Sequence, residues 1–193
     1  MVELGGTALL VLAAGLSQRF GEGSKLMAPL RGKPLALHFA DTVAGAAFAH
    51  KLVVCRQGDA VLQAEFAGRG FEVVVNPDSG RGQASSLALG VTAFMRRNPQ
   101  AIMVCLADMP FVTVAHLEAV VGALGNNVSV VASRLPAGQP SPPAAFAPVH
   151  FDALTRLEGD KGARSLLAGA YLIDAPADVL ADFDTPGDFA NLG

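Results

Sequence analysis

The chain has 193 residues, of which 51% are hydrophobic and 16% are charged, and its formal net charge is -3. This composition is too apolar and too weakly charged for a disordered chain. A slightly acidic protein with no Trp and one Tyr also lacks the cationic surface and the stacking platforms of a nucleic-acid-binding protein. The length is that of one domain, so we expect residues 1–193 to form a single domain.

The N-terminal region gives no sign of a membrane segment. The uncharged run from Leu4 to Gln18 is shorter than the ~20 apolar residues that a membrane-spanning helix needs. Glu3 precedes this run at the place where a signal peptide carries Lys or Arg. We therefore expect no membrane partner and a cytoplasmic location. Cys55 and Cys105 form no C-x-x-C pair, and we interpret them as small buried hydrophobic residues.

Short apolar runs alternate with helical patterns along the first two thirds of the chain. Strands are predicted over Thr7–Ala13, Leu52–Cys55, Phe71–Val75, Ala101–Leu106 and Val128–Ser133. Helices are predicted over Pro34–Ala49, Asp59–Ala67, Gln83–Arg97 and Thr113–Leu124. The strands are continuously apolar, which is typical of strands covered on both faces. This alternation predicts an α/β fold with a mostly parallel central sheet.

The last third of the chain is less regular. Five prolines between Pro136 and Pro148 predict a loop within the domain. Further elements are expected as short helices near Val149–Leu157 and Gly162–Ala170, edge strands over Tyr171–Asp174 and Val179–Asp184, and a last helix over Pro186–Leu192.

Ligands of such a sheet bind at the carboxyl ends of its strands, so the segment after the first strand is the first candidate site. Small residues here let backbone amides approach a ligand closely, and two cations six residues apart suit a polyphosphate. The alternative is a solvated glycine-rich turn, because neither a Walker A nor a G-x-G-x-x-G pattern is present. The candidate residues are Leu12, Ala13, Ala14, Gly15, Ser17, Arg19 and Lys25.

A second candidate follows the third predicted strand, where Gly80-Arg81-Gly82 leads into a helix that carries Ser85 and Ser86. Free amides at a helix start, with hydroxyls beside them, suit an anion or a base edge. The two serines are equally compatible with simple helix capping.

Candidate metal ligands lie after the fourth strand and near the C-terminus. Asp108 follows the apolar run Ala101–Leu106, and Mg²⁺ is typically held by one or two carboxylates together with phosphate oxygens. Asp182 and Asp184 are candidates for a second ligand. The alternatives are a turn or helix-capping role for Asp108 and a helix-start motif for the other two.

Taken together, these segments resemble the MobA-like nucleotidyltransferases, the molybdenum cofactor cytidylyltransferases in particular. The resemblance depends on the order and spacing of its motifs, and it spans Leu9 to Phe189. The motifs are Leu-Ala-Ala-Gly-x-Ser-x-Arg-Phe-Gly from Leu12, Leu-Ala-Asp-Met-Pro from Leu106, Asp-Phe-Asp-Thr-Pro-Gly-Asp from Asp182, and supporting stretches at Ala28–Leu35, Gly82–Gly90 and Leu157–Leu167.

The resemblance implies a three-layer Rossmann-like nucleotidyltransferase fold and transfer of a cytidylyl group from CTP to the phosphate of molybdenum-molybdopterin, with release of pyrophosphate. It implies that the loop up to Lys25 wraps the nucleotide, that Arg19 and Lys25 hold the triphosphate, and that Gly82, Ser85 and Ser86 lie near the base or sugar. Asp108 then binds Mg²⁺, with Asp182 or Asp184 as second ligand. A recipient molybdoenzyme, or its maturation chaperone, is the further partner implied.

Two features of the motifs bear on specificity. Guanylyl-transferring relatives usually have Leu-Ala-Gly-Gly where this chain has Ala14 before Gly15, which favours CTP over GTP. Relatives also often carry Gly-Asn/His-Pro where this chain has Ser141-Pro142-Pro143, in a region expected to face the acceptor. The alternatives left open are a nucleotidyltransferase that uses GTP or another phosphorylated acceptor, an NAD(P)-dependent oxidoreductase on the same scaffold, and a catalytically silent nucleotide-binding module.

Overall fold

The computed structural model describes residues 2–15, 20, 24–125, 127–159, 163–176, 178–181, 183 and 185–190. Among them, seven strands form one sheet in the order β5-β4-β1-β6-β8-β7-β9. These strands are β1 (Thr7–Ala13), β4 (His50–Arg56), β5 (Glu72–Asn76), β6 (Ala101–Leu106), β7 (Val130–Arg134), β8 (Pro140–Phe146) and β9 (Tyr171–Asp174). A small hairpin joins β2 (Pro29–Leu30) to β3 (Lys33–Pro34).

Neighbouring strands run parallel in this sheet except around β8. β1 pairs in parallel with β4 on one side and β6 on the other, and β5 extends this half beyond β4. β8 runs antiparallel to both β6 and β7, and β9 pairs in parallel with β7 at the edge. The predicted α/β fold with a mostly parallel central sheet is confirmed.

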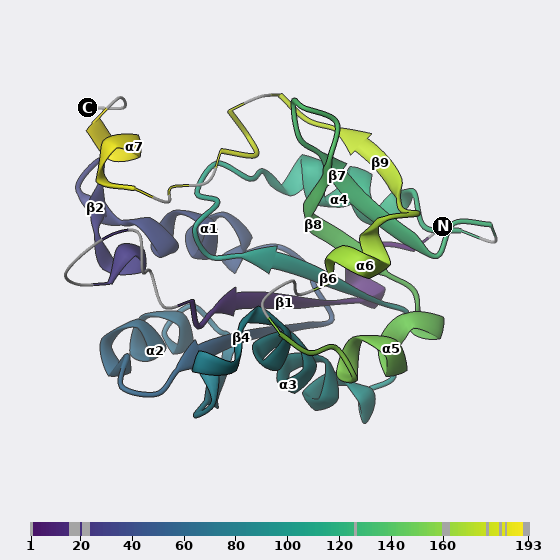
Figure 1. Cartoon of the computed structure of the whole chain (residues 1–193), viewed down its shortest axis with the longest axis horizontal. Coiled ribbons are helices and arrows are strands. Elements are labelled where there is room, and N and C mark those ends of the chain that lie inside the picture. Colours follow the sequence, from purple (N-terminus) through teal and green to yellow (C-terminus); the bar gives the residue numbers. More distant parts are fainter. Residues whose placement is uncertain are drawn as a thin grey trace.

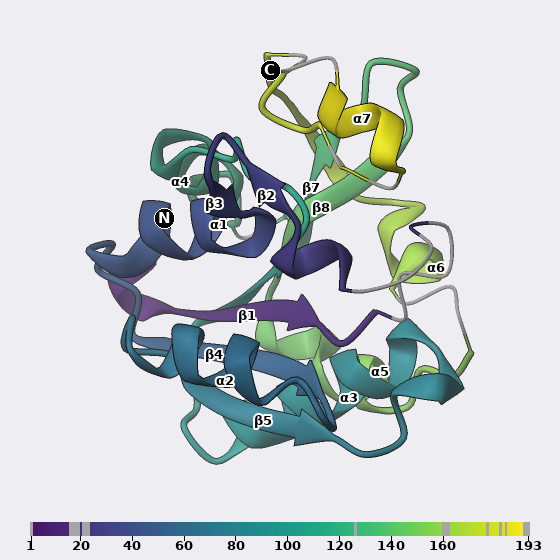
Figure 2. The ribbon, with the colours of Figure 1, turned by 90° about the vertical axis from the view of Figure 1, so that its left-hand side faces the viewer.

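Helices cover both faces of the sheet (Figures 1 and 2). Side chains of α1 (Leu35–Ala44), α2 (Ala60–Ala67) and α4 (Val114–Gly122) pack on one face. Side chains of α3 (Gln83–Met95), α5 (Phe151–Thr155) and α6 (Arg164–Leu167) pack on the other. Figure 2 shows α1 and α4 across β1 from α3 and α5. The chain also contains α7 (Pro186–Ala190) and short 3-10 helices at Leu4–Gly6, Lys25–Met27, Ser79–Arg81 and Pro148–His150.

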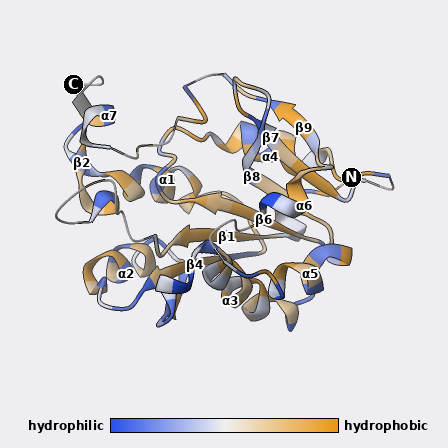
Figure 3. Cartoon of the chain, viewed as in Figure 1, coloured by the Kyte–Doolittle hydropathy of each residue, from blue (hydrophilic) through white to orange (hydrophobic). Residues whose placement is uncertain are grey.

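Two apolar cores hold these layers together. Alternate residues of β1 enter opposite cores: Leu9 and Val11 face α1, whereas Leu10 and Leu12 face α3. All seven residues of β1 are buried, which explains why the strand is continuously apolar in the sequence. Figure 3 shows hydrophobic residues concentrated in the central strands. No helix among the described residues is long and apolar enough to cross a membrane.

Three sequence-based expectations for the elements are wrong. The proline-rich stretch Pro136–Pro148 contains β8, because two of its prolines occupy an irregularity where the ladder needs no N–H donor. The first helix ends at Ala44, before Gly45, and not at Ala49. In the described part of the predicted strand Val179–Asp184 no strand forms, because Val179, Leu180 and Phe183 pack their side chains into the cores.

Candidate functional site

The predicted site segments meet at one edge of the sheet. Leu12 of β1 is in register with Leu106 of β6, and the Ala107 amide donates to the Leu12 carbonyl over 3.1 Å. On the other side of β1, Ala13 is in register with Cys55 of β4. The strands are parallel, so their carboxyl ends place the loops after β1, β4, β5 and β6 next to one another.

Two predicted site residues, Lys25 and Asp108, bond directly to each other at this edge. The Lys25 Nζ donates to Asp108 Oδ2 over 2.7 Å, and the two side chains are only 9% and 21% exposed. They are 83 positions apart in the sequence, so the fold alone brings them together. A charge-assisted hydrogen bond in this partly buried setting holds the ammonium and the carboxylate groups in place at the end of β6.

The second carboxylate oxygen of Asp108 is the notable feature of this pair. Oδ1 is buried and accepts no hydrogen bond from any of the described residues. Burying a carboxylate oxygen without a partner costs free energy, because the atom loses its hydrogen bonds to water and forms none in the protein. The oxygen is therefore ready to accept a cation or a donor supplied by a ligand.

The chemistry of these residues fits a divalent cation held jointly with a substrate. Mg²⁺ is usually bound through one or two carboxylates together with phosphate oxygens, and Asp108 supplies one such carboxylate. In the part of the chain that the structure describes, no group of three or more His, Cys, Asp or Glu side chains could hold a metal by itself. A cation here would thus need oxygen atoms of the nucleotide.

The first loop is only partly described. Leu12, Ala13 and Ala14 are buried, and their side chains pack in the cores, so these residues can meet a ligand only through their backbone. A methyl group added at Gly15 would meet no described atom within 4 Å. Predicted site residues Ser17 and Arg19 lie outside the described residues, and so do the predicted metal ligands Asp182 and Asp184.

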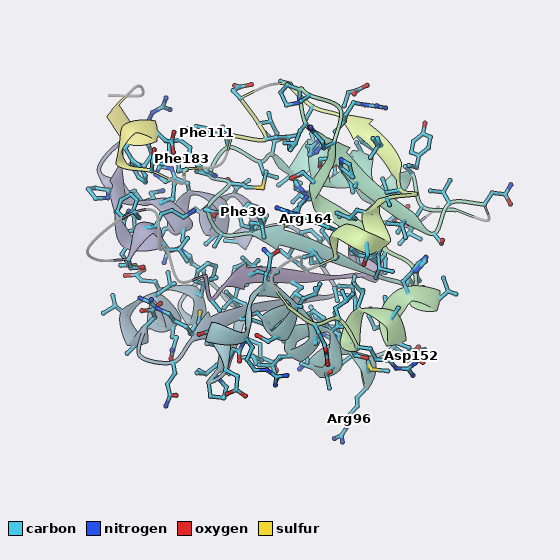
Figure 4. The ribbon with its side chains drawn as sticks, viewed as in Figure 1. Phe39, Arg96, Phe111, Asp152, Arg164 and Phe183 are labelled. Carbon is cyan, nitrogen blue, oxygen red and sulfur yellow. The ribbon has the colours of Figure 1, made fainter. Side chains whose placement is uncertain are left out.

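Aromatic side chains connect these loops to the C-terminal segment. Phe111, which follows Asp108 by three residues, packs on Phe183 with ring centroids 5.8 Å apart, and Figure 4 shows the two together near α7. Phe183 contacts Phe189 at 5.2 Å, and Phe189 contacts Phe20 of the first loop at 5.4 Å. Phe183 and Phe189 are thereby packed against the loop that follows Asp108.

The second candidate loop has a framework that the sequence did not reveal. Asn76, buried at the end of β5, donates from Nδ2 to Ser85 Oγ over 3.0 Å and to Ser86 Oγ over 2.9 Å. Its Oδ1 accepts from the Asp78 amide over 2.9 Å. Gly82 has a φ of +95°, which favours glycine, and precedes the first residue of α3.

This framework changes the interpretation of the two serines. Ser85 Oγ donates to the Gly82 carbonyl over 2.8 Å, and Ser86 is buried beneath Asn76. The Ser85 amide donates to Gly82, and the Ala84 amide donates to the carbonyl of Gly159. Two of the first amides of α3 are thus already engaged. Both serine hydroxyls bond within the protein, and their proposed place near a base or sugar stays a prediction. The Asn-Pro sequence after the third predicted strand was the signal that could have identified Asn76.

A further pair at the end of β4 was also missed. Arg56 donates from Nε and Nη2 to the two carboxylate oxygens of Asp59, over 2.7 and 3.0 Å. The hydrogen bond to Asp59 raises the pKa of Arg56 above its ordinary value. Asp59 precedes α2, yet it makes no side-chain capping bond there, because Arg56 occupies its carboxylate. The signal in the sequence that could have predicted this ion pair was the i, i+3 spacing of Arg56 and Asp59.

Known proteins resemble the chain over almost its whole length. The MobA-like NTP transferase domain family matches residues 9–176. The purine catabolism protein PucB of Bacillus subtilis is 35% identical over 191 residues, which cover 92% of this chain and 91% of that protein. Both findings span far more than the first candidate loop.

Solved structures give the same picture. Rv0371c of Mycobacterium tuberculosis is 29% identical and superposes with a TM-score of 0.81, over 96% of each chain. Its complex with manganese is 26% identical with a TM-score of 0.76, over 96% of this chain and 97% of that one. Molybdopterin-guanine dinucleotide biosynthesis protein A of Archaeoglobus fulgidus, at 19% identity and a TM-score of 0.66 over 96% of each chain, shares the fold.

Proposed function

The chain belongs to the family of MobA-like NTP transferase domains, and from this premise we propose that it transfers a cytidylyl group from CTP to the phosphate of molybdenum-molybdopterin, with release of pyrophosphate. The single observation that carries the proposal is the Lys25–Asp108 pair with its unpartnered Asp108 Oδ1. A cation donor and a carboxylate with one open oxygen are the two groups that a metal-bound triphosphate requires.

The reaction needs no nucleophilic side chain from the protein. A terminal phosphate oxygen of the acceptor attacks the α-phosphorus of CTP, the bond from that phosphorus to the bridging oxygen breaks, and pyrophosphate leaves with the electron pair. A phosphate monoester is already ionised near neutral pH, so no general base is required. The protein contributes alignment and charge neutralisation, which dominate phosphoryl-type transfers.

Each described site residue then has a defined task. Lys25 binds phosphate oxygens of the nucleotide and stabilises the charge that develops on the leaving pyrophosphate. Asp108 would hold a divalent cation, Mg²⁺ in our proposal, and the ion would neutralise charge on the phosphate oxygens. The manganese complex of Rv0371c supports divalent metal use by a relative. Arg19 shares the triphosphate with Lys25, and Asp182 or Asp184 supplies a second metal ligand, in the assignment that the resemblance implies.

CTP is proposed as the nucleotide because of the Ala14-Gly15 sequence of the first loop. The Ala14 methyl packs in the core beside Leu12, so it does not crowd a base directly. The preference for CTP over GTP therefore rests on the resemblance of the first-loop sequence to cytidylyltransferases.

The acceptor would enter where the end of β6 lies beside the start of β8 in their antiparallel ladder. α6 precedes β9, which begins in register with Val131 near the start of β7. Exposed Arg164 is the first residue of α6, and Figure 4 shows it there. An arginine at this position suits a phosphate of the second substrate.

We also propose a cytoplasmic location and a single domain over residues 1–193, with a recipient molybdoenzyme or its maturation chaperone as partner. Cys55 and Cys105 are free and buried, which agrees with a reducing compartment. Burial raises the pKa of the Cys55 thiol to about 12, so it stays protonated and inert.

The test is pyrophosphate release from CTP and from GTP, each with Mg²⁺ and molybdenum-loaded molybdopterin. We expect turnover that depends on the acceptor and is faster with CTP. Faster turnover with GTP would correct the base but leave nucleotidyl transfer in place. Hydride transfer to or from a nicotinamide cofactor without Mg²⁺ would instead support the oxidoreductase alternative.

A further inference from the structure

A buried polar pair lies between α4 and the second half of the sheet. His116 of α4 and Ser133 of β7 have exposed fractions of 7% and 0%, and His116 Nε2 lies 2.8 Å from Ser133 Oγ. The Ser133 hydroxyl in turn donates to the carbonyl of Pro143 in β8 over 2.8 Å. Three elements are therefore connected through two hydrogen bonds inside the protein.

The hydrogen-bond chemistry fixes the form of the histidine. A hydroxyl has one hydrogen, and Ser133 uses it for Pro143, so its oxygen must accept from His116. Nε2 of His116 thus carries a proton. Burial lowers the pKa of this ring, which leaves it neutral near pH 7 with Nδ1 unprotonated.

Ser133 lies at an irregularity of the β7–β8 ladder. Ala132 pairs with Ala144 and Ser133 pairs with Ser141, so Pro142 and Pro143 are extra residues on β8. Proline has no N–H to give to the ladder, and its carbonyl would be left buried without a ladder partner. The Ser133 hydroxyl satisfies the carbonyl of Pro143, and His116 holds that hydroxyl in place.

The segment anchored in this way borders the candidate site. Ala144 pairs with Val104 in the antiparallel β6–β8 ladder, so the preceding residues of β8 run along the last residues of β6. Asp108 follows the end of β6 by two residues. His116 lies on the helix that follows the Asp108 loop, and its backbone amide donates to the N-cap Thr113 side chain over 3.2 Å.

We propose that His116 and Ser133 form a positioning pair for the second substrate, because they hold residues 140–143 as a fixed wall beside Asp108. This inference rests on the proposed nucleotidyl transfer, since the wall matters only if an acceptor docks against it. The pair contacts neither nucleotide nor acceptor and acts through the backbone of Pro143. Loss of the pair should therefore weaken acceptor binding. It should leave CTP binding unchanged, because CTP binding depends on the opposite half of the sheet.

The first arm of the test needs no substrate. Hydrogen exchange is measured at the Ser141 and Ala144 amides in wild type, His116→Leu, Ser133→Ala and His116→Gln. We expect faster exchange in the first two variants, because the anchor of Pro143 is lost. His116→Gln places an amide donor where Nε2 lies, so it is the matched control and should exchange as wild type does. Equal exchange in His116→Leu and wild type overturns the proposal.

The second arm measures steady-state kinetics with Mg²⁺, CTP and molybdenum-loaded molybdopterin. In His116→Leu and Ser133→Ala we expect the acceptor KM to rise about tenfold or more, since small misplacements near a reacting centre are costly. The CTP KM should change by less than about twofold, as expected when one subsite alone is altered. His116→Gln should restore the acceptor KM. An equal rise in both KM values, or no rise, overturns the inference.

The two arms keep the two claims apart. Absence of turnover in the wild-type protein would contradict the proposed function, and the exchange comparison would still decide whether the pair anchors residues 140–143. Circular dichroism and thermal melting of every variant identify a loss of folding, and Ser133→Ala provides a second way to break the same hydrogen-bond chain.

Discussion

The two halves of the sheet place their chemistry in different ways. In the half made of β5, β4, β1 and β6, every strand is parallel to its neighbours, and apolar strand ends deliver Lys25, Asn76 and Asp108 to one edge. In the other half, β8 runs antiparallel to both of its neighbours, and a buried hydroxyl must bond to the carbonyl of one of its prolines. In the function that we propose, the first half places the nucleotide by its topology, and the second shapes the acceptor side through hydrogen bonds between its elements.

The largest effect should come from Asp108. We expect Asp108→Ala to lose about 10²–10³-fold in turnover, as when one group that stabilises transition-state charge is removed. The protein should remain folded, because the side chain is already partly unsatisfied. Pyrophosphate release is the measurement, with Asp152→Ala, in the first turn of α5, as the control. Near-normal turnover in Asp108→Ala would show that Asp108, and with it the parallel half, does not hold the catalytic metal.

Loss of Lys25 should be the next largest effect. Lys25→Ala removes a cation that is bonded to Asp108 at 2.7 Å, and we expect CTP affinity to fall by about tenfold or more. Calorimetric titration with Mg-CTP measures this, and Lys33→Ala, which alters an exposed lysine, is the control. Unchanged affinity for CTP in Lys25→Ala would show that the triphosphate lies elsewhere.

Packing of the parallel half should tolerate little extra volume. A methyl added at Gly90 of α3 would lie 2.3 Å from Leu10 Cδ1, so Gly90→Ala should lower the free energy of unfolding by about 1–3 kcal/mol. Gly122→Ala in α4 is the control, because its methyl meets no described atom within 4 Å. Urea unfolding of both variants gives the comparison, and equal stabilities would contradict close packing of α3 on β1.

The smallest effect concerns pH and the second half. Burial keeps the pKa of His116 below its usual value of 6.5, so the unfolded chain takes up a proton first as the pH falls. The native state therefore loses stability as pH falls through 6.5 and on toward the lowered pKa. We expect the free energy of unfolding of wild type to fall more steeply below pH 6.5 than that of His116→Gln. Parallel pH profiles would mean that the buried ring titrates normally.

The sequence predicted the parallel half well because its signals are local. Continuous apolar runs mark buried strands, and the residues that follow them meet at one edge, as Lys25 and Asp108 do. The antiparallel half was not predictable in this way. Pro142 and Pro143 argue locally against a strand, and only the hydroxyl of Ser133, supplied from another strand, makes their place in β8 acceptable.

Part of the site was missed for a related reason. Asn76 was not singled out from the sequence, yet its side chain bonds to both Ser85 and Ser86. Such a network depends on distances between a strand end and a helix start, which no spacing in the sequence specifies. The roles of Arg19, Asp182 and Asp184 stay predictions from the resemblance.

The central claim, nucleotidyl transfer to a phosphorylated acceptor, is tested most directly by mass spectrometry of the acceptor. Wild-type protein is incubated with Mg²⁺, CTP and molybdenum-loaded molybdopterin. The account predicts an acceptor that has gained one cytidylyl group, together with one pyrophosphate for each product formed. An acceptor of unchanged mass, with CTP intact or hydrolysed without transfer, would contradict it.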